Sequence, residues 1–195
     1  MDLTTPVLQG TLVRLEPLSL DHLPQLCEVG LDEEIWRWAM TPIETPEQMR
    51  NEIETALRWK AEGSAIPFAT VEAKSGRAIG STRFANIDHR NRRVEIGWTW
   101  IGRRWQRTGI NTEAKYLMLR YAFETLGRIR VEFKADSLNE KSRTALLRIG
   151  AKPEGIFRNH MIADSGRIRH SAYFSIIEGE WPDVKARLER MMREH

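Results

Sequence analysis

The stretch from Val94 to Ala114 constrains the fold most, because it joins an alternating segment, an arginine-rich turn and an apolar stripe. Residues 94–101 alternate and predict a strand. One face of it would carry Val94, Ile96, Trp98 and Trp100, and the other Glu95, Gly97, Thr99 and Ile101. Apolar residues at helical spacing then predict an amphipathic helix over residues 111–126. The chain must therefore place the start of a helix beside the end of a strand.

The turn between this strand and this helix is suited to bind an anion. The first N–H groups of a helix lack internal partners and lie at the positive end of its dipole. Gly109 removes a side chain there, and Arg103, Arg104 and Arg107 supply positive charge. These features predict a site for a pyrophosphate-sized anion. The alternative is a basic loop with an ordinary helix N-cap. Neither a P-loop nor a Gly-x-Gly-x-x-Gly turn is present, which disfavours ATP hydrolysis and dinucleotide chemistry.

The order of predicted elements indicates a mixed α/β fold. Helices are expected at residues 20–29, 32–40, 46–62, 111–126, 140–149 and 182–193. Strands are expected at residues 11–17, 66–73, 78–87, 94–101, 129–135, 155–162 and 168–177. We therefore predict a mostly antiparallel sheet of about seven strands with helices on both faces.

A chain of 195 residues, 41% of them hydrophobic, can build a sizeable core, and no linker or repeat divides it. We expect one domain over residues 1–195, with its core at about 8–177 and a C-terminal helix at 178–195. No apolar run approaches the ~20 residues that span a bilayer, and no signal peptide is evident. We therefore expect a cytoplasmic protein without a membrane partner. The lone Cys27, and histidines without metal-ligand spacing, predict no disulfide and no metal.

The net charge of +3 conceals a segregation of charge along the chain. Residues 28–62 hold nine acidic and four basic residues, whereas residues 63–134 hold fourteen basic and six acidic residues. The basic segment could bind nucleic acid, an anionic membrane or the phosphates of a cofactor, and the acidic segment could attract a cationic substrate. Solvated surface is the alternative for both.

Two motifs resemble those of a known family. Gln106-Arg-Thr-Gly109-Ile-Asn111 is similar to the Gln/Arg-x-x-Gly-x-Gly/Ala acetyl-CoA loop of the GNAT acetyltransferases. Asn139-Glu-Lys-Ser142 resembles the Asn-x-x-Ser of the RimJ/RimL-type branch, and the element order is similar as far as about residue 177. The departure is Asn111, which stands where the family has glycine or alanine. Its side chain would either crowd the phosphates or add a donor to them.

The resemblance implies acetyl-CoA as cosubstrate. Its pantetheine amides would pair with the backbone of Trp100–Gly102, where the strand separates from residues 129–135. The residues implied in binding are Trp100, Ile101, Gly102, Arg103, Arg104, Gln106, Arg107, Thr108, Gly109, Ile110, Asn111, Thr112, Asn139 and Ser142.

Two catalytic residues are implied as well. Glu95 would act as the general base for the amine, and Ser142 would donate a proton to the coenzyme A sulfur. The alternative for Glu95 is a structural ion pair with Arg93 or Arg83. The alternative for Ser142 is a position in a first turn that Asn139 caps.

The acceptor side is predicted less directly. Trp36, Trp38 and His160, together with Glu95, are candidates to bind the substrate, although aromatic residues at helical spacing are more often core.

The function expected is acetyl transfer to a primary amine through a ternary complex, with a protein N-terminus, for example of a ribosomal protein, as the acceptor. The alternatives are a small amine such as a polyamine, an amino acid or an aminoglycoside-like drug, and a non-catalytic module that binds coenzyme A or nucleic acid. Nucleic acid is the weaker of these, and a homodimer through the last helix and Trp181 is a further expectation.

Overall fold

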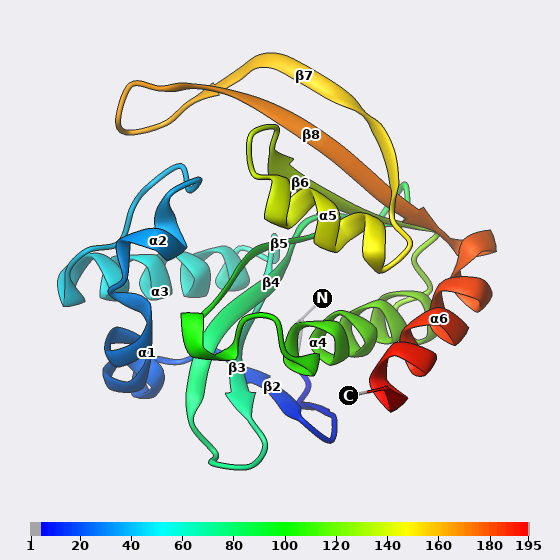
Figure 1. Ribbon diagram of the computed structural model, residues 1–195, viewed down its shortest axis with the longest axis horizontal. Coiled ribbons are helices and arrows are strands. Elements are labelled where there is room, and N and C mark those ends of the chain that lie inside the picture. Colours follow the sequence, from blue (N-terminus) through cyan, green and yellow to red (C-terminus); the bar gives the residue numbers. More distant parts are fainter. Residues whose placement is uncertain (1–4, 195) are drawn as a thin grey trace.

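The centre of the protein is an eight-stranded sheet with the strand order β1-β2-β3-β4-β5-β6-β8-β7, as the computed structural model shows for residues 5–194 (Figure 1). The strands are β1 (Leu8–Gln9), β2 (Val13–Pro17), β3 (Ile66–Glu72), β4 (Ala78–Asp88), β5 (Arg93–Ile101), β6 (Arg130–Asp136), β7 (Lys152–Ile162) and β8 (Ile168–Ile177). Every neighbouring pair is antiparallel except β5 and β6. The mostly antiparallel sheet is confirmed. It has one strand more than predicted, because the two residues of β1 are too few to show alternation. Residues 1–4 and 195 of the expected domain lie outside the described part.

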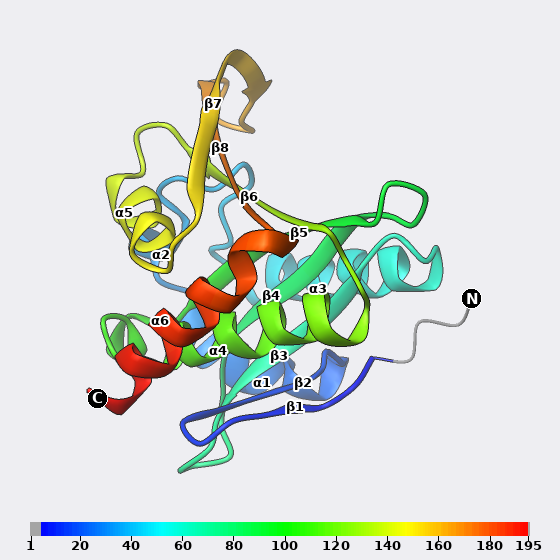
Figure 2. The ribbon, with the colours of Figure 1, turned by 90° about the vertical axis from the view of Figure 1, so that its right-hand side faces the viewer.

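Helices cover both faces of the sheet, as predicted (Figure 2). One face carries α1 (Leu23–Gly30), α2 (Glu33–Trp36) and α3 (Pro46–Ala61). The other carries α4 (Gly109–Arg120), α5 (Glu140–Arg148) and α6 (Trp181–Arg193). None of the helices in the described part has the length and apolar content that a membrane crossing requires.

Local signals set the ends of α3. Gln48 N donates to Thr45 Oγ1 at 3.2 Å, and Thr45 N donates to Gln48 Oε1 at 3.0 Å, which completes a capping box. Pro46 occupies the first helical position, where its missing N–H costs nothing. Gly63 follows the last turn with a φ of +73°. The predicted start of this helix is therefore confirmed, and its end differs by one residue.

Two apolar cores lie on the two faces of the sheet. The larger joins Phe68, Phe84 and Val94 to α4, α5 and α6, and the smaller joins Val71 and Trp100 to α1 and α3. Trp181 belongs to the larger core, where it is only 6% exposed and stacks on Phe123. The expectation that Trp181 forms a dimer contact is therefore wrong, because its ring is buried within the chain.

The strand β5 separates from β6 partway along its length. Their parallel pairing covers Arg93 to Glu95 opposite Arg130 to Glu132 and continues no further within the described sheet. Beyond it, β6 remains paired to β8 as far as Asp136. The edge of β5 from Ile96 onward therefore faces away from β4 without a strand partner.

A bulge at Trp98 reverses the faces of β5. Gly97 pairs with Arg83 and Trp100 pairs with Ser81, so two residues of β5 oppose one of β4. Trp98 adopts a φ of +49°. Beyond the bulge, Trp98 and Trp100 lie on the α1–α3 face with Glu95, whereas Thr99 and Ile101 face α4. Strict alternation predicted that Trp98 and Trp100 share a face of the strand with Val94. That prediction is therefore wrong for the second half of the strand.

Candidate active site

The helix α4 begins at Gly109, two residues earlier than predicted. Thr108 is its N-cap, because Thr108 Oγ1 accepts a hydrogen bond from Ile110 N at 3.3 Å. The same hydroxyl donates to Trp105 O at 2.7 Å. The buried Gly109 therefore leaves backbone N–H groups at the helix start without a side chain over them, as an anion site requires.

The loop before α4 is held by its own side chains. Gln106 Nε2 donates to Ile101 O at 3.0 Å, and Trp105 Nε1 donates to Glu72 Oε1 at 2.8 Å. Hydrogen bonds from Ser75 and Trp105 hold the pKa of Glu72 below its usual value. Gln106, like Thr108, thus fixes the loop, while Arg103, Arg104 and Arg107 remain exposed.

The open edge of β5 leads from this loop to Glu95. The side chains of Trp100 and Ile101 are buried in the two cores, so only their backbone is available at the edge. Gly102 N donates to Ile79 O at 2.8 Å. The structure therefore brings the open edge of β5 at Trp100 and Ile101 next to the loop before α4, where Gln106 bonds to the Ile101 carbonyl.

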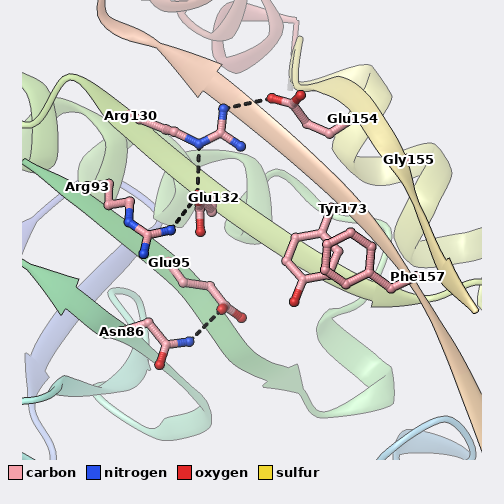
Figure 3. Close-up of a pocket in the computed structure, with 9 residues that line it drawn as sticks. All are labelled: Asn86, Arg93, Glu95, Arg130, Glu132, Glu154, Gly155, Phe157 and Tyr173. Carbon is pink, nitrogen blue, oxygen red and sulfur yellow. Dashed lines mark hydrogen bonds and ion pairs between the residues drawn. The ribbon is translucent and has the colours of Figure 1, made fainter. Parts of the chain in front are cut away.

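Glu95 is 4% exposed and lies at the inner side of a pocket (Figure 3). Asn86 Nδ2 donates to Glu95 Oε2 at 2.8 Å, and Lys134 Nζ lies 3.8 Å from the same oxygen. The other oxygen, Oε1, lies over Gly97, where an added Cβ would stand 3.0 Å from it. The alternative ion pair of Glu95 with Arg83 or Arg93 does not form, because Arg83 pairs with Glu52 and Arg93 with Asp88 and Glu132.

The pocket has a volume of about 580 Å³ and combines charged and aromatic side chains. Its lining residues are Asn86, Arg93, Glu95, Arg130, Glu132, Glu154, Gly155, Phe157 and Tyr173. Ion pairs run across its wall, from Arg93 to Glu132 at 3.4 Å, from Glu132 to Arg130 at 2.8 Å and from Arg130 to Glu154 at 2.7 Å (Figure 3). The rings of Phe157 and Tyr173 pack 4.6 Å apart. Burial, with the charges of Glu95 and Glu132, raises the pKa of Tyr173.

The predicted residues on α5 cap the helix. Asn139 Oδ1 accepts a hydrogen bond from Ser142 N at 3.1 Å, and Ser142 is half-buried in the first turn. Thr112 is fully buried, and its hydroxyl accepts from Arg148 Nη2 at 3.1 Å, which joins α4 to α5. The hydroxyl of Thr112 is thereby occupied.

The structure separates the residues predicted to bind the acceptor. Trp36 is 8% exposed, donates through Nε1 to Gly30 O at 2.6 Å and packs 5.3 Å from Trp100. It is therefore a core residue, and its prediction as a substrate-binding residue is corrected. Trp38 is half-buried beside the guanidinium of Arg167, 5.5 Å from its ring.

His160 lies outside the Glu95 pocket. Its Nδ1 is 3.0 Å from Ser171 Oγ, and it lines a second pocket with Phe157, Arg158, Asn159 and His170. Phe157 belongs to both pockets. His160 is therefore adjacent to the candidate site and does not face Glu95 directly.

Most of the pocket wall was missed from the sequence. Its residues come from five strands, and only Glu95 was predicted. One signal was available in β6, where Arg130, Glu132 and Lys134 alternate with Val131, Phe133 and Ala135. That alternation places the three charged side chains on one face of the sheet, as observed.

Comparison with known proteins agrees with this arrangement. A family profile described as "Acetyltransferase (GNAT) domain" matches residues 13–152. The "Putative ribosomal N-acetyltransferase YdaF" of Bacillus subtilis is 30% identical over 179 residues, which cover 90% of this chain and 94% of that protein.

Two solved structures agree with the fold. A GCN5-related N-acetyltransferase from Brucella melitensis superimposes with a TM-score of 0.88 at 31% identity, covering 98% of this chain and 87% of that one. Mycobacterium smegmatis RimJ, solved with CoA-disulfide, has a TM-score of 0.80 at 22% identity, covering 96% of this chain and 92% of that one, and supports the fold. The matched domain, together with the relative named as a ribosomal N-acetyltransferase, supports the RimJ/RimL-like branch. With a profile match over most of its length and a 30% identical relative, this chain belongs to the GNAT acetyltransferase family.

Proposed function

We propose that this protein transfers an acetyl group from acetyl-CoA to a primary amine by direct attack in a ternary complex. The observation that carries the proposal is the unpaired edge of β5, which joins the start of α4 to Glu95. A ligand that lies along this edge would meet an anion site at the start of α4 and the buried carboxylate of Glu95 at the other end.

The chain offers a suitable site for the coenzyme. The first backbone N–H groups of α4 that Thr108 does not cap, with Arg103, Arg104 and Arg107, would hold the pyrophosphate. The backbone of Trp100–Gly102 would pair with the pantetheine amides, and Asn139 and Ser142 would border its far side. When bound, acetyl-CoA supplies an activated acetyl thioester.

Glu95 is the proposed base on the acceptor side. An acceptor amine with a pKa of about 8 or higher is mostly protonated at neutral pH and must lose a proton before it attacks. Glu95 Oε1 lies over Gly97 and is not used by Asn86 or Lys134, which both approach Oε2. This oxygen can therefore take the proton, directly or through a water. Ser142 is the proposed hydroxyl beside the departing sulfur.

We propose a protein N-terminus as the acceptor. The name of the 30% identical relative, "Putative ribosomal N-acetyltransferase YdaF", supports this class. The pocket also supports it, because carboxylates attract an amine while Phe157 and Tyr173 offer apolar contacts to a neighbouring side chain.

An acceptor panel tests this proposal. Release of coenzyme A thiol is measured with peptides that carry a free N-terminus, with the same peptides blocked at the N-terminus, and with polyamines. We expect the highest kcat/KM with free peptides and no turnover with blocked ones. Turnover with polyamines alone would favour the small-amine alternative, and acetyl-CoA binding without turnover of any amine would favour a non-catalytic module.

A further inference from the structure

The helix α4 carries two polar side chains with a buried polar atom, the half-buried Asn111 through its Oδ1 and the buried Lys115. They are four residues apart and therefore lie on one side of the helix. Lys115 Nζ donates to Thr99 Oγ1 at 2.8 Å, and Thr99 Oγ1 lies 2.7 Å from Thr82 Oγ1. Asn111 Oδ1 is buried without a hydrogen-bond partner among residues 5–194. Buried polar atoms of this kind call for a functional explanation, because an unsatisfied buried group is costly.

The contacts of neighbouring residues show which way this side of α4 faces. The carboxylate of Glu113 accepts hydrogen bonds from the backbone of Thr11, Leu12 and Val13, so Glu113 faces the β1–β2 turn. Thr112 bonds to Arg148 of α5. Lys115 faces neither of these partners but Thr99 of β5, whose hydroxyl lies beside Thr82 of β4, and Asn111 is one turn earlier on the same side of α4.

Lys115 has no counter-charge. It is 6% exposed, and within the described residues no carboxylate pairs with it. Burial alone lowers its pKa from 10.5 to about 7. The charged groups on adjoining elements have other partners: Glu113 holds the β1–β2 turn, Arg148 bonds to Thr112 and Glu189 of α6 accepts from Tyr116. Glu95 lies on the opposite face of β5.

The position of Lys115 suits the leaving group of acetyl transfer. The carboxylate of Glu95 lies over Gly97, and Thr99 is two residues, or ~7 Å, further along the strand. An amine held at Glu95 and a thioester laid along the edge beside α4 would meet at this part of β5. The amine would then approach from one face of the strand, with Lys115 on the other.

We propose that Lys115 donates a proton to the coenzyme A sulfur and offsets its negative charge as the thioester is cleaved. The proposal rests on the proposed function. The amine nitrogen forms the new bond to the acetyl carbon, and the C–S electron pair passes to sulfur. One N–H bond of the Lys115 ammonium breaks as the S–H bond forms, and the neutral amine regains a proton from solvent.

Ser142 cannot supply this proton by itself. A serine hydroxyl is a far weaker acid than a thiol, so transfer from it to a thiolate is uphill unless another acid replaces the proton. An ammonium that titrates near neutral pH matches the task, because acid catalysis works best near the operating pH. Ser142 can donate a hydrogen bond to the sulfur while Lys115 holds the proton.

The direct test is the ionisation of bound coenzyme A. Thiolate absorbance in the ultraviolet is titrated for free coenzyme A and for its complexes with the wild type, Lys115→Met and the matched control Lys60→Met, with desulfo-coenzyme A as blank. Lys115 and the thiol should titrate as a coupled pair in which the thiolate and the ammonium stabilise each other, so the thiolate should appear at a lower pH than in free coenzyme A, in the wild type and in Lys60→Met. In Lys115→Met the thiol should titrate as in free coenzyme A.

The outcomes separate this inference from the proposed function. An unshifted thiol in the wild-type complex, or an equal shift in Lys115→Met, would overturn the role of Lys115 while coenzyme binding stands. If neither coenzyme A nor desulfo-coenzyme A binds the wild type, the proposed function fails with it. If Lys115→Met weakens the binding of coenzyme A and of desulfo-coenzyme A equally and leaves thiol ionisation unchanged, Lys115 only contacts the pantetheine and the proposal is overturned.

A measurement without ligand checks the burial on which the inference depends. The unfolded chain keeps Lys115 protonated up to about its ordinary pKa of 10.5, whereas the folded chain releases the proton near 7. The wild type should therefore gain thermal stability relative to Lys115→Met as the pH rises from about 7 toward 10. A constant difference in Tm over this range would show that Lys115 is not desolvated, and the inference would be lost.

Discussion

Glu95→Gln lowers kcat for acetyl transfer by about 10²–10⁴-fold, the range that general acid–base groups contribute, and leaves acetyl-CoA affinity unchanged. The amide preserves the shape of the side chain but cannot accept the proton of the amine. Glu95 lies on the acceptor face, away from the start of α4, so coenzyme contacts should persist. Steady-state kinetics with the best acceptor of the panel measure kcat, and calorimetric titration measures the Kd of acetyl-CoA.

The pH dependence and a matched variant complete this test. Glu62→Gln makes the same chemical change at an exposed position just after α3, and we expect wild-type kinetics from it. In Glu95→Gln, the residual rate should rise with pH as the free amine becomes more abundant. Wild-type turnover in Glu95→Gln at every pH would remove Glu95 from the mechanism and leave proton transfer to water.

Phe84→Ala is expected to cost about 3–5 kcal/mol of unfolding free energy, the range for deleting a buried aromatic side chain. Phe84 is fully buried, with its ring 6.0 Å from Phe68 and 6.1 Å from Tyr121. It therefore joins β3 and β4 to the end of α4. Denaturant unfolding measures the loss as a lower midpoint at an unchanged slope.

Phe157→Ala provides the matched comparison for Phe84→Ala. The same atoms are removed from a ring that is 55% exposed, so the loss should be less than half as large. Equal losses from the two substitutions would contradict the assignment of Phe84 to the centre of the larger core. A changed slope would indicate that the unfolding is no longer two-state.

Elements with local signals could be predicted from the sequence. Thr45 and Gln48 form their capping box whatever the rest of the chain does, and Gly127 and Gly150 end the segments before them with φ of +58° and +99°. The bulge at Trp98 has no such signal. A tryptophan at positive φ is unfavourable by itself and is maintained by the surrounding packing, here against Trp59 of α3.

The coenzyme side and the acceptor side of the candidate site also differ in how far the sequence predicts them. The loop before α4 is contiguous in the sequence, so its motif could be read from spacing alone. The acceptor pocket takes residues from β4, β5, β6, β7 and β8, which the sheet brings together over long sequence separations. Trp36 illustrates the limit, since its helical spacing favours a core residue without excluding a substrate site, and its burial against Trp100 decides between them.

The proposed function depends on acetyl-CoA binding at the start of α4 and along the open edge of β5. Thermal unfolding with acetyl-CoA, and with ATP and NAD as controls, tests it most directly. At 100 times its Kd, acetyl-CoA should stabilise the fold by about 2.7 kcal/mol, which raises Tm by a few degrees, while ATP and NAD leave it unchanged. An unchanged Tm at millimolar acetyl-CoA would contradict the account.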